Sequence, residues 1–467
     1  MRIIVVGAGE VGTYIAERLS GQEHHVALVE LNAERFRQVE TELDLLTVRG
    51  SGTDPETLSA AGIDHADLLV ATTNSDETNL LSALLARRAG VSKTIVRVES
   101  RRLRRPEVAA LFDGMDDHLV IDPDQEVADS ILRLVEYPGA VDLARMADGE
   151  VVVIGARLPA HAPLVGVSLF ALGRELDPDW DFIVGTITRR SDDGDGDEET
   201  LIPRADAVLR EGDLLRVICK SRALRDVTHR LGIAREVPTR ALLLGGGRTA
   251  QLLAESLIGR GLDVAIIEKK ADRARELSEE VTAALIYHGD ITDVDMLEDA
   301  DVALQDVVIA LTGEDDANVL ACLYAKSAGA RRHRNGPDSG PETIAVVHRL
   351  KLLELLEANQ VDAAFSPRTA TANSVLRFVR GDVETVAAVA TFLHGDAEIL
   401  EFAVSEDSPC EGRTLAELDI PKEALIGAIV RDGKPRIARG NSTLRDQDHV
   451  IAIAKPGSVD RVTSLFG

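Results

Sequence analysis

Two glycine-rich loops are the segments of this sequence whose residue types best suit chemistry. The first runs from Gly7 to Gly12 with the pattern Gly-Ala-Gly-Glu-Val-Gly, and the second, beginning Gly-Gly-Gly-Arg-Thr, runs from Gly245 to Ala250. Each follows an apolar strand and opens a helix. Glycine allows the sharp turn, lets backbone N–H groups approach a pyrophosphate, and lets the helix pack on the strand. The pattern therefore predicts a nucleotide-binding loop in each half of the chain.

An acidic residue accompanies each loop. Glu30 and Glu268 end the second strand of each half, about 20 residues beyond the glycines, where an acid hydrogen-bonds a ribose 2′-hydroxyl. Loop and acid repeat with the same spacing, so they repeat as a unit. A carboxylate at this place would repel a 2′-phosphate, which disfavours NADP. The alternative is a solvated acid at a strand end.

A polar segment, Thr72 to Asp76, lies just beyond the carboxyl end of a strand expected at 68–72. Ligands of open parallel sheets bind at this edge. Asn74, Ser75 and Asp76 can instead cap the next helix, and both roles are compatible.

Arg97 is the only charged residue of the strand expected at 94–98, within a sheet expected to be buried. A buried guanidinium needs an anionic partner. A nucleotide phosphate fits because arginine binds it in a bidentate way, and a structural salt bridge is the alternative. The aligned residue of the second half is Val346, so that half lacks this cation, although Arg248 or Lys269 can substitute.

The elements that must position these residues form a repeat. Short apolar strands alternate with amphipathic helices in both halves, which predicts two parallel, doubly wound Rossmann-type sheets of the α/β class. A proline-led helix follows each, and then a smaller strand-rich module. We expect Rossmann domains at 1–137 and 238–380 and small α/β domains at 138–233 and 381–467, the product of a tandem duplication.

The composition excludes several classes of function. The 467 residues carry 79 acids against 52 bases, a formal net charge of −27. Such a surface disfavours nucleic acid and repels an anionic bilayer, and its simplest meaning is solubility in a salty cytoplasm. No stretch approaches the roughly 18 apolar residues of a membrane span. The chain opens directly on a strand, so we expect no signal peptide and a cytoplasmic location.

Familiar catalytic patterns are missing from the sequence. There is no nucleophile elbow, no His-Glu-x-x-His and no Walker lysine. The three cysteines are far apart and suggest neither a disulfide framework nor a zinc site. The acidic run 192–199 departs from the EF-hand pattern and is expected to be a solvated hairpin loop. The insertion 331–341, absent from the first half, is expected to be a surface loop. We therefore expect neither catalytic nor metal-binding residues.

The ordered set of Gly7 to Gly12, Glu30, Asn79, Arg97 and Asp122-Pro123 resembles the regulator-of-potassium-conductance (RCK/KTN) family. The tandem order resembles the cytoplasmic regulatory subunits of Trk potassium uptake systems. The resemblance implies binding of NAD(H), with ATP or ADP as alternative ligands of the same sites. It also implies a homo-oligomeric ring, a tetramer or dimer of dimers, on the inner face of the membrane beneath a Trk-type channel subunit.

By the same resemblance, two sets of residues contact the nucleotides. In the first site these are Gly7, Ala8, Gly9, Glu10, Val11, Gly12, Glu30, Thr73, Asn74 and Arg97, and in the second they are Gly245, Gly246, Gly247, Arg248, Thr249, Glu268 and Asp290. Ala250 in place of the third glycine and Val346 in place of the arginine set the second site apart.

Three functions remain open on the sequence alone. A non-enzymatic, nucleotide-sensing regulator of potassium uptake agrees with the resemblance. An NAD-dependent oxidoreductase with duplicated Rossmann domains is the alternative, although the small modules offer no evident proton-transfer residue. The third is a nucleotide-binding scaffold without a transporter.

Overall fold

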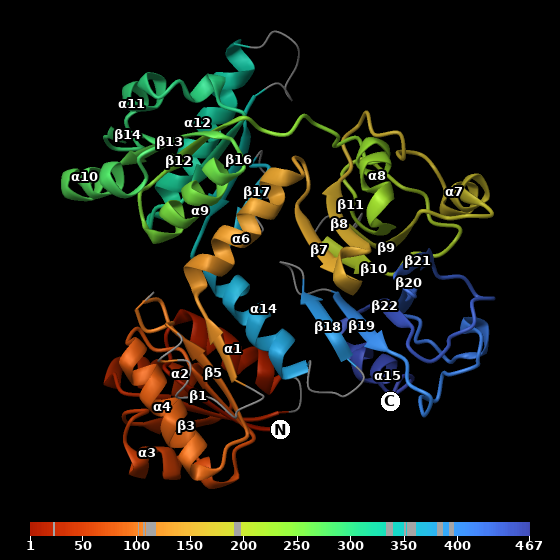
Figure 1. Ribbon diagram of the computed structural model, residues 1–467, viewed down its shortest axis with the longest axis horizontal. Coiled ribbons are helices and arrows are strands. Elements are labelled where there is room, and N and C mark those ends of the chain that lie inside the picture. The colour runs from red at the N-terminus through yellow and green to blue at the C-terminus, as the bar shows by residue number, and fades with distance from the viewer. Residues whose placement is uncertain are drawn as a thin grey trace.

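The computed structural model describes residues 1–21, 24–100, 102–105, 108, 118–190, 198–332, 340–349, 352, 361–380, 386–391 and 397–467. Four sheets follow one another along the chain, two parallel and two antiparallel. Figure 1 shows the two parallel sheets with their helices on one side of the molecule and the two antiparallel sheets on the other. Most of the acidic run 192–199 and most of the insertion 331–341 lie outside the described residues.

The first parallel sheet has the Rossmann strand order 3-2-1-4-5-6. Its strands are near-continuous apolar runs, as expected for a parallel sheet covered on both faces. They are, in spatial order, β3 (Leu46–Arg49), β2 (His25–Glu30), β1 (Arg2–Val6), β4 (Leu68–Ala71), β5 (Lys93–Arg97) and β6 (His118–Ile121). The helices are α1 (Glu10–Ser20), α2 (Ala33–Glu42), α3 (Pro55–Ala60) and α4 (Asp76–Ala89).

The second parallel sheet repeats the first in order and direction. Its strands are β14 (Leu285–His288), β13 (Asp263–Glu268), β12 (Arg240–Leu244), β15 (Val307–Ala310), β16 (Glu342–Val346) and β17 (Ala363–Phe365). Its helices are α9 (Arg248–Gly259), α10 (Ala271–Glu280), α11 (Val294–Asp299) and α12 (Asp315–Arg332). The predicted duplication of a doubly wound fold is confirmed.

The two small domains are five-stranded antiparallel sheets. The first contains β10 (Glu198–Leu201), β9 (Phe182–Arg190), β11 (Leu214–Lys220), β8 (Val151–Arg157) and β7 (Asp142–Met146), with α7 (Leu169–Leu176) and α8 (Leu224–Arg230). The second contains β18 (Val386–Thr391), β19 (Glu398–Ala403), β22 (His449–Ala454), β20 (Ala424–Arg431) and β21 (Lys434–Ile437), with α15 (Val459–Thr463).

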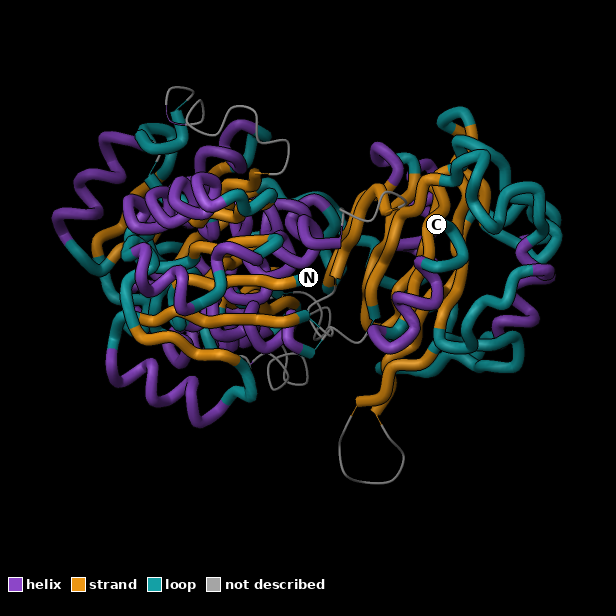
Figure 2. Tube along the Cα trace, turned by 90° about the horizontal axis from the view of Figure 1, so that it is seen from below, coloured by secondary structure: helices purple, strands orange, loops and turns teal. Residues whose placement is uncertain are grey.

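The two small domains pack against each other. Val153 and Ile218 of the first share one apolar cluster with Ile451 and Ile453 of the second. A Cβ at Gly427 would lie 2.2 Å from Cδ1 of Ile218, so the absence of a side chain there allows β20 to approach β11 closely. Figure 2 shows these strands gathered at one end of the molecule.

Helix α6 (Pro123–Glu136) joins the first Rossmann domain to its small domain but packs on the second Rossmann domain. Val127, Ile131 and Leu134 share a core with Leu253 and Leu257 of α9. The chain segment that the sequence assigns to the first half therefore completes the hydrophobic layer of the second.

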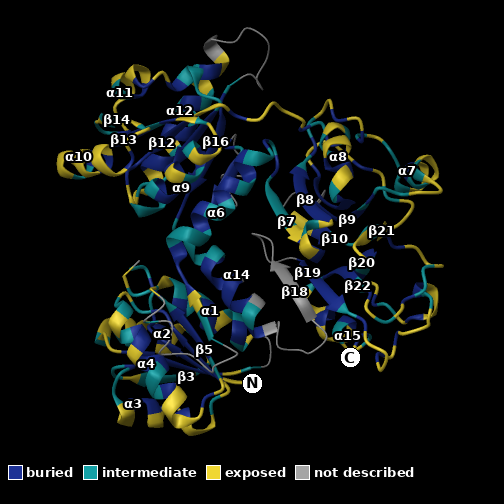
Figure 3. Ribbon diagram, in the orientation of Figure 1, coloured by how far each residue is buried: buried dark blue, intermediate teal, exposed yellow. Residues whose placement is uncertain are grey.

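Helix α14 (Pro367–Arg380) makes the reciprocal exchange. Val375, Leu376 and Val379 lie in one cluster with Ile15 and Leu19 of α1. The two exchanged helices also contact each other, and both present buried faces toward the middle of the molecule (Figure 3). Among the residues that the structure describes, none of the helices has the length and apolarity to cross a membrane.

Candidate functional site

The first glycine loop has the geometry that its sequence predicts. Gly7 adopts a φ of +100°, which L side chains rarely adopt, and its N–H donates to the Val29 carbonyl at 2.8 Å. A Cβ at Gly12 would lie 1.9 Å from the Gly7 carbonyl oxygen, so only glycine lets α1 begin this close to the turn. Gly9 differs, because a Cβ there would meet nothing within 4 Å. The open side of the loop is therefore at Gly9, at the N-terminus of α1.

The second loop keeps the turn and changes the helix packing. Gly245 has a φ of +104° and donates to the Ile267 carbonyl at 2.8 Å, and a Cβ at Gly247 would again meet nothing within 4 Å. Ala250 stands where the first loop has Gly12 and is fully buried. With the geometry of the first loop, this methyl group would lie about 1.9 Å from the carbonyl oxygen of the turn. Helix α9 therefore cannot begin as close to its turn as α1 does.

Glu30 and Glu268 both brace their own loops. The two oxygens of Glu30 accept from the N–H groups of Ala8 at 2.7 Å and Asn32 at 2.6 Å. Glu268 accepts in the same way from the N–H groups of Gly246 at 2.8 Å and Lys270 at 2.7 Å. Each carboxylate oxygen has a second lone-pair direction, so bracing the loop leaves capacity to accept from a ribose hydroxyl.

The rim beyond β4 is fixed by a buried asparagine. The side chain of Asn79, fully buried, accepts from the Thr73 N–H at 2.9 Å and donates to the Arg97 carbonyl at 2.9 Å. Asn318 repeats this network with Thr312 and the Val346 carbonyl. The network ties the ends of two neighbouring strands together and holds the rim beside the glycine loop.

The remaining rim residues divide between capping and exposure. The hydroxyl of Ser75 accepts from the Thr78 N–H at 3.1 Å as the cap of α4, and Asp76 accepts from the N–H groups of Glu99 and Ser100. The capping role expected for Ser75 is therefore present. Asn74 is exposed at the same edge and remains a predicted ligand contact.

Arg97 ends β5 rather than lying inside the sheet. Its side chain is 19% exposed and its Nε donates to Oε1 of Glu99 at 3.0 Å. The anionic partner that the sequence requires is thus a neighbouring carboxylate, at a surface where a phosphate can compete for it. Val346, the aligned residue, is buried and apolar.

The two cations expected to substitute in the second site are both paired. Lys269 contacts Asp290 at 2.9 Å. The hydrogen bond from Lys269, followed by those from the N–H and hydroxyl of Thr292, lowers the pKa of Asp290 to about 2. Arg248 instead leaves its own half, with its guanidinium 3.0 and 2.5 Å from the two oxygens of Asp122.

Contacts between the loops and the exchanged helices were not foreseen from the sequence. Arg248 and Thr249 both bind Asp124 in the first turn of α6. In the other half, Nε of Arg368 in the first turn of α14 donates to Glu10 at 2.9 Å. The only sequence signal was a proline-led helix after each Rossmann unit, which does not reveal the loop that the helix reaches.

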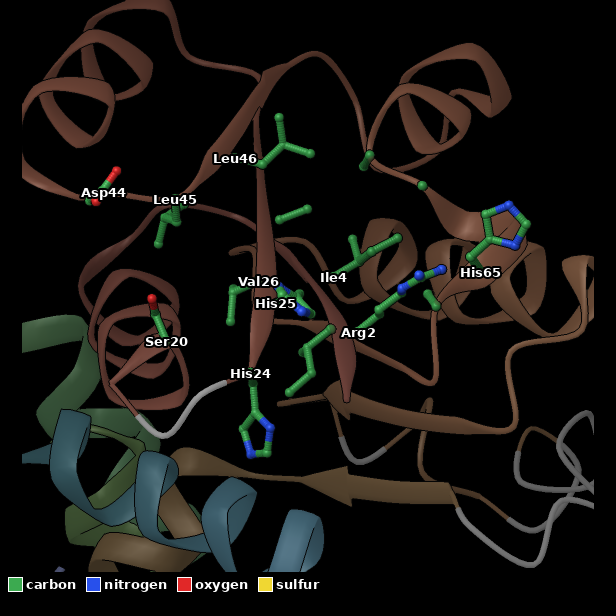
Figure 4. Close-up of a pocket in the computed structure, with 15 residues that line it drawn as sticks. Arg2, Ile4, Ser20, His24, His25, Val26, Asp44, Leu45, Leu46 and His65 are labelled. Carbon is green, nitrogen blue, oxygen red and sulfur yellow. The ribbon is translucent and has the colours of Figure 1, made fainter. Parts of the chain in front are cut away.

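A cavity of about 460 Å³ lies at the opposite edge of the first sheet, where β1, β2 and β3 begin. Arg2, His24, His25 and His65 are among its lining residues, as Figure 4 shows. Because ligands of Rossmann sheets bind at the carboxyl ends of the strands, this cavity is separate from the glycine-loop site. Among the described residues, no cluster of side chains is arranged to hold a metal ion.

Comparison with protein families covers most of the chain. The TrkA-N domain model matches residues 3–106 and again 241–367, and the TrkA-C domain model matches residues 399–467. The repeated match falls on β1 to β5 of the first Rossmann sheet and on β12 to β17 of the second.

Comparison with curated proteins gives full-length relatives. The chain is 31% identical over 453 residues to the Trk system potassium uptake protein TrkA of Halomonas elongata, covering 97% of this chain and 95% of that protein. It is 32% identical over 469 residues to the TrkA homolog of Archaeoglobus fulgidus, with 100% of both chains covered.

Among solved structures, the chain resembles the structure titled "GsuK channel bound to NAD" with a TM-score of 0.60 and 17% identity. That match covers 100% of this chain and 78% of the other. It also resembles the GsuK RCK domain, with a TM-score of 0.60, 18% identity, and coverage of 100% and 94%. At this identity the likeness concerns the fold.

Proposed function

The chain belongs to the TrkA family of Trk system potassium uptake proteins, and from this premise we propose that it is the nucleotide-sensing regulatory subunit of a potassium uptake system. Its membrane partner is a Trk-type channel or transporter subunit, which it contacts from the cytoplasmic face as a homo-oligomer. The family membership supports the regulatory role, and the geometry of the glycine loops supports the nucleotide.

One observation carries the nucleotide assignment. Gly9 and Gly247 each stand at a helix N-terminus, and a Cβ at either position would meet nothing within 4 Å. A side chain would fit these places in the folded chain, so packing does not explain the glycines. A pyrophosphate at the helix N-terminus does, because its oxygens must approach the backbone N–H groups closely. The residues present therefore fit NAD(H), with ATP and ADP as alternative ligands.

The chain's own residues would divide the work of binding. The N–H groups from Gly9 and Gly247 onward, at the starts of α1 and α9, would face the phosphates, because those of Ala8 and Gly246 are taken by the carboxylates. Glu30 and Glu268 would accept from a ribose hydroxyl, and both acids disfavour a 2′-phosphate. In the first site Thr73, Asn74 and Arg97 form the far rim, and in the second Asp290 lies at the end of β14. A bound nucleotide changes the assembly only by binding one conformation more tightly than another, which makes the subunit a ligand-biased regulator.

The two open glycines also provide the test. Gly9→Ala and Gly247→Ala, made separately in the full chain, place a methyl group where the phosphates would lie and disturb no other residue. We expect each to weaken NADH and ADP binding at its own site by ten- to a hundredfold, since one charge-assisted hydrogen bond is worth about 1.5–3 kcal/mol. The thermal midpoint should fall by only about 1–3 °C, because alanine is a much poorer N-cap than glycine but the cost of about 1 kcal/mol is spread over a large chain. Unchanged titrations in both variants would contradict the assignment.

The regulatory proposal also excludes turnover. NADH incubated with the protein and a panel of small carbonyl compounds should keep its absorbance at 340 nm, whereas steady oxidation would favour the oxidoreductase alternative. Recovery of a Trk-type membrane subunit with the tagged full-length protein, measured from membranes of the same source, tests the partner. Failure to recover it would favour a scaffold that works without a transporter.

A further inference from the structure

The two junctions between glycine loop and exchanged helix have opposite polarity. Arg248 occupies in the second loop the place that Glu10 has in the first. Arg368 follows Pro367 in α14 as Asp124 follows Pro123 in α6. One junction therefore pairs an acidic loop with a basic helix, and the other a basic loop with an acidic helix.

The first junction joins Glu10, the first residue of α1, to Arg368. Nε of Arg368 donates to Oε2 at 2.9 Å and a second guanidinium nitrogen contacts Oε1. The Arg368 side chain is 22% exposed and Glu10 is 58% exposed. The pair is bidentate, which gives it directional specificity as well as attraction.

The second junction is more deeply buried. Both oxygens of Asp122 bind the guanidinium of Arg248, and Asp122 is only 5% exposed. Asp124 adds a contact with the guanidinium at 3.2 Å and a hydrogen bond from the Thr249 hydroxyl. Asp122 also contacts Arg104 at 2.7 Å, so its charge is balanced from two sides.

The placement of the cations runs against an ordinary helix preference. Arg248 begins α9 and Arg368 lies in the first turn of α14, where the helix dipole is positive and favours acids. Local helix stability therefore does not account for either arginine. Each is matched instead by an acid from the other half of the chain.

The same charges penalise the alternative pairing. In the alternative, α6 would pack on the first glycine loop of a second chain, and α14 on its second glycine loop. Glu10 would then face Asp122 and Asp124, and Arg248 would face Arg368. Both junctions would then bring like charges together. Since the halves share one fold and bury similar helix faces, apolar packing discriminates poorly between the two pairings.

We propose that the inverted charges are a recognition code that directs each exchanged helix to the glycine loop of the other half. The code selects the pairing of first half with second half, which one chain satisfies by itself, over the pairing of identical halves from two chains. Specificity of this kind needs both an attraction in the right pair and a repulsion in the wrong one, and these charges supply both.

The first test is a charge-reversal cycle at the first junction in the full-length protein. We expect Glu10→Arg and Arg368→Glu each to lower the midpoint of thermal unfolding by about 1–3 °C at low salt, because the pair is partly exposed and its reversal replaces attraction with repulsion. The double variant Glu10→Arg/Arg368→Glu should recover more than half of the loss. Glu17→Arg is the matched control, because it changes the net charge equally on the exposed face of α1. A double variant that loses as much as the two single variants together would overturn the code.

The second test asks about pairing itself. Glu10→Arg/Arg248→Glu exchanges the loop charges, which makes the native pairing repulsive and the pairing of identical halves attractive. We expect species of higher mass by light scattering in 50 mM KCl, with a return toward the wild-type mass in 1 M KCl, where charges are screened within about 3 Å. Wild-type mass and midpoint in this variant would show that the covalent link alone sets the pairing. If the variant does not fold, the charge-reversal cycle decides.

Discussion

Replacing Arg97 with alanine gives the sharpest prediction about the first nucleotide site. Arg97 ends β5, and β4 lies between β5 and β1, so the guanidinium starts two strand spacings, about 10 Å, from the glycine loop. In the structure it is held by Glu99. To meet a phosphate, Arg97 must leave that carboxylate and extend across the end of β4.

The magnitude follows from the two competing partners. The pair between Arg97 and Glu99 is partly exposed, 19% and 42%, and such pairs contribute about 0–1 kcal/mol. A charge-assisted hydrogen bond to a phosphate contributes about 1.5–3 kcal/mol. The net gain on binding is therefore on the order of 0.5–3 kcal/mol. Arg97→Ala should weaken binding by roughly 2- to 150-fold and shift the thermal midpoint by less than about 2 °C.

Isothermal titration of ADP, ATP, NAD and NADH measures this effect. Both variant and reference should carry Gly247→Ala, so that the first site alone reports. Glu99→Gln is the informative partner, because it removes the competing carboxylate and should raise the affinity up to about fivefold. An Arg97→Ala variant that binds all four nucleotides as the reference does would refute the phosphate role. So would weaker binding by Glu99→Gln, which would make the pair itself part of the site.

Three further predictions concern the supports of the sites. Glu30→Gln leaves one oxygen to accept from the buried N–H of Ala8 and the partly buried N–H of Asn32. We expect a loss of about 1–3 kcal/mol in unfolding free energy and weaker binding at the first site, measured by thermal unfolding and titration. An unchanged midpoint would contradict the bracing role. Asn79→Ala leaves the Thr73 N–H and the Arg97 carbonyl without their partner and should lower the free energy of unfolding by about 2–4 kcal/mol. The control Asn74→Ala, at an exposed residue, should lower it by less than about 0.5 kcal/mol. Equal losses in differential scanning calorimetry would argue against the network. Burial raises the pKa of Glu342 from 4.5 to about 7, so the folded state binds this proton more tightly than the unfolded state does. The contribution of this proton to the free energy of unfolding, roughly 3 kcal/mol, is present below about pH 4.5 and is lost as the pH rises through about 7. The midpoint of thermal unfolding of Glu342→Gln should therefore depend less on pH between pH 5 and 8 than that of the wild type, and at pH 8 it should be the higher of the two. Parallel pH profiles of wild type and variant would contradict this.

The Glu342 carboxylate illustrates what long-range packing adds. It begins β16 in the second half, yet it accepts from the N–H of Gly139 in the first half at 3.0 Å and is only 2% exposed. Asp362 nearby also raises its pKa, whereas Arg235 and Lys326 lower it. No local pattern distinguishes this glutamate from an exposed strand-end acid, because its burial comes from a residue 203 positions away.

The local chemistry of the site was readable from the sequence because it depends on neighbours in the chain. The turn at Gly7, the acid at Glu30 and the cap at Ser75 are set by glycine conformation, strand length and side-chain reach, and each repeats in the second half where the residues repeat. The departures at Ala250 and Val346 were equally readable. Arg97 was less so, because its partner Glu99 lies beyond the strand end, where direction depends on the turn.

The sequence by itself determined two Rossmann folds, two small domains and a glycine-rich loop between strand and helix in each half, since alternating apolar runs and glycine spacing encode these locally. Only the tertiary structure decided that α6 and α14 exchange places and that Arg248 serves Asp122 rather than its own loop. The physical reason is that either helix presents an apolar face that either half could bury. The choice rests on a few charges that are far apart in the chain and meet only once the halves have packed.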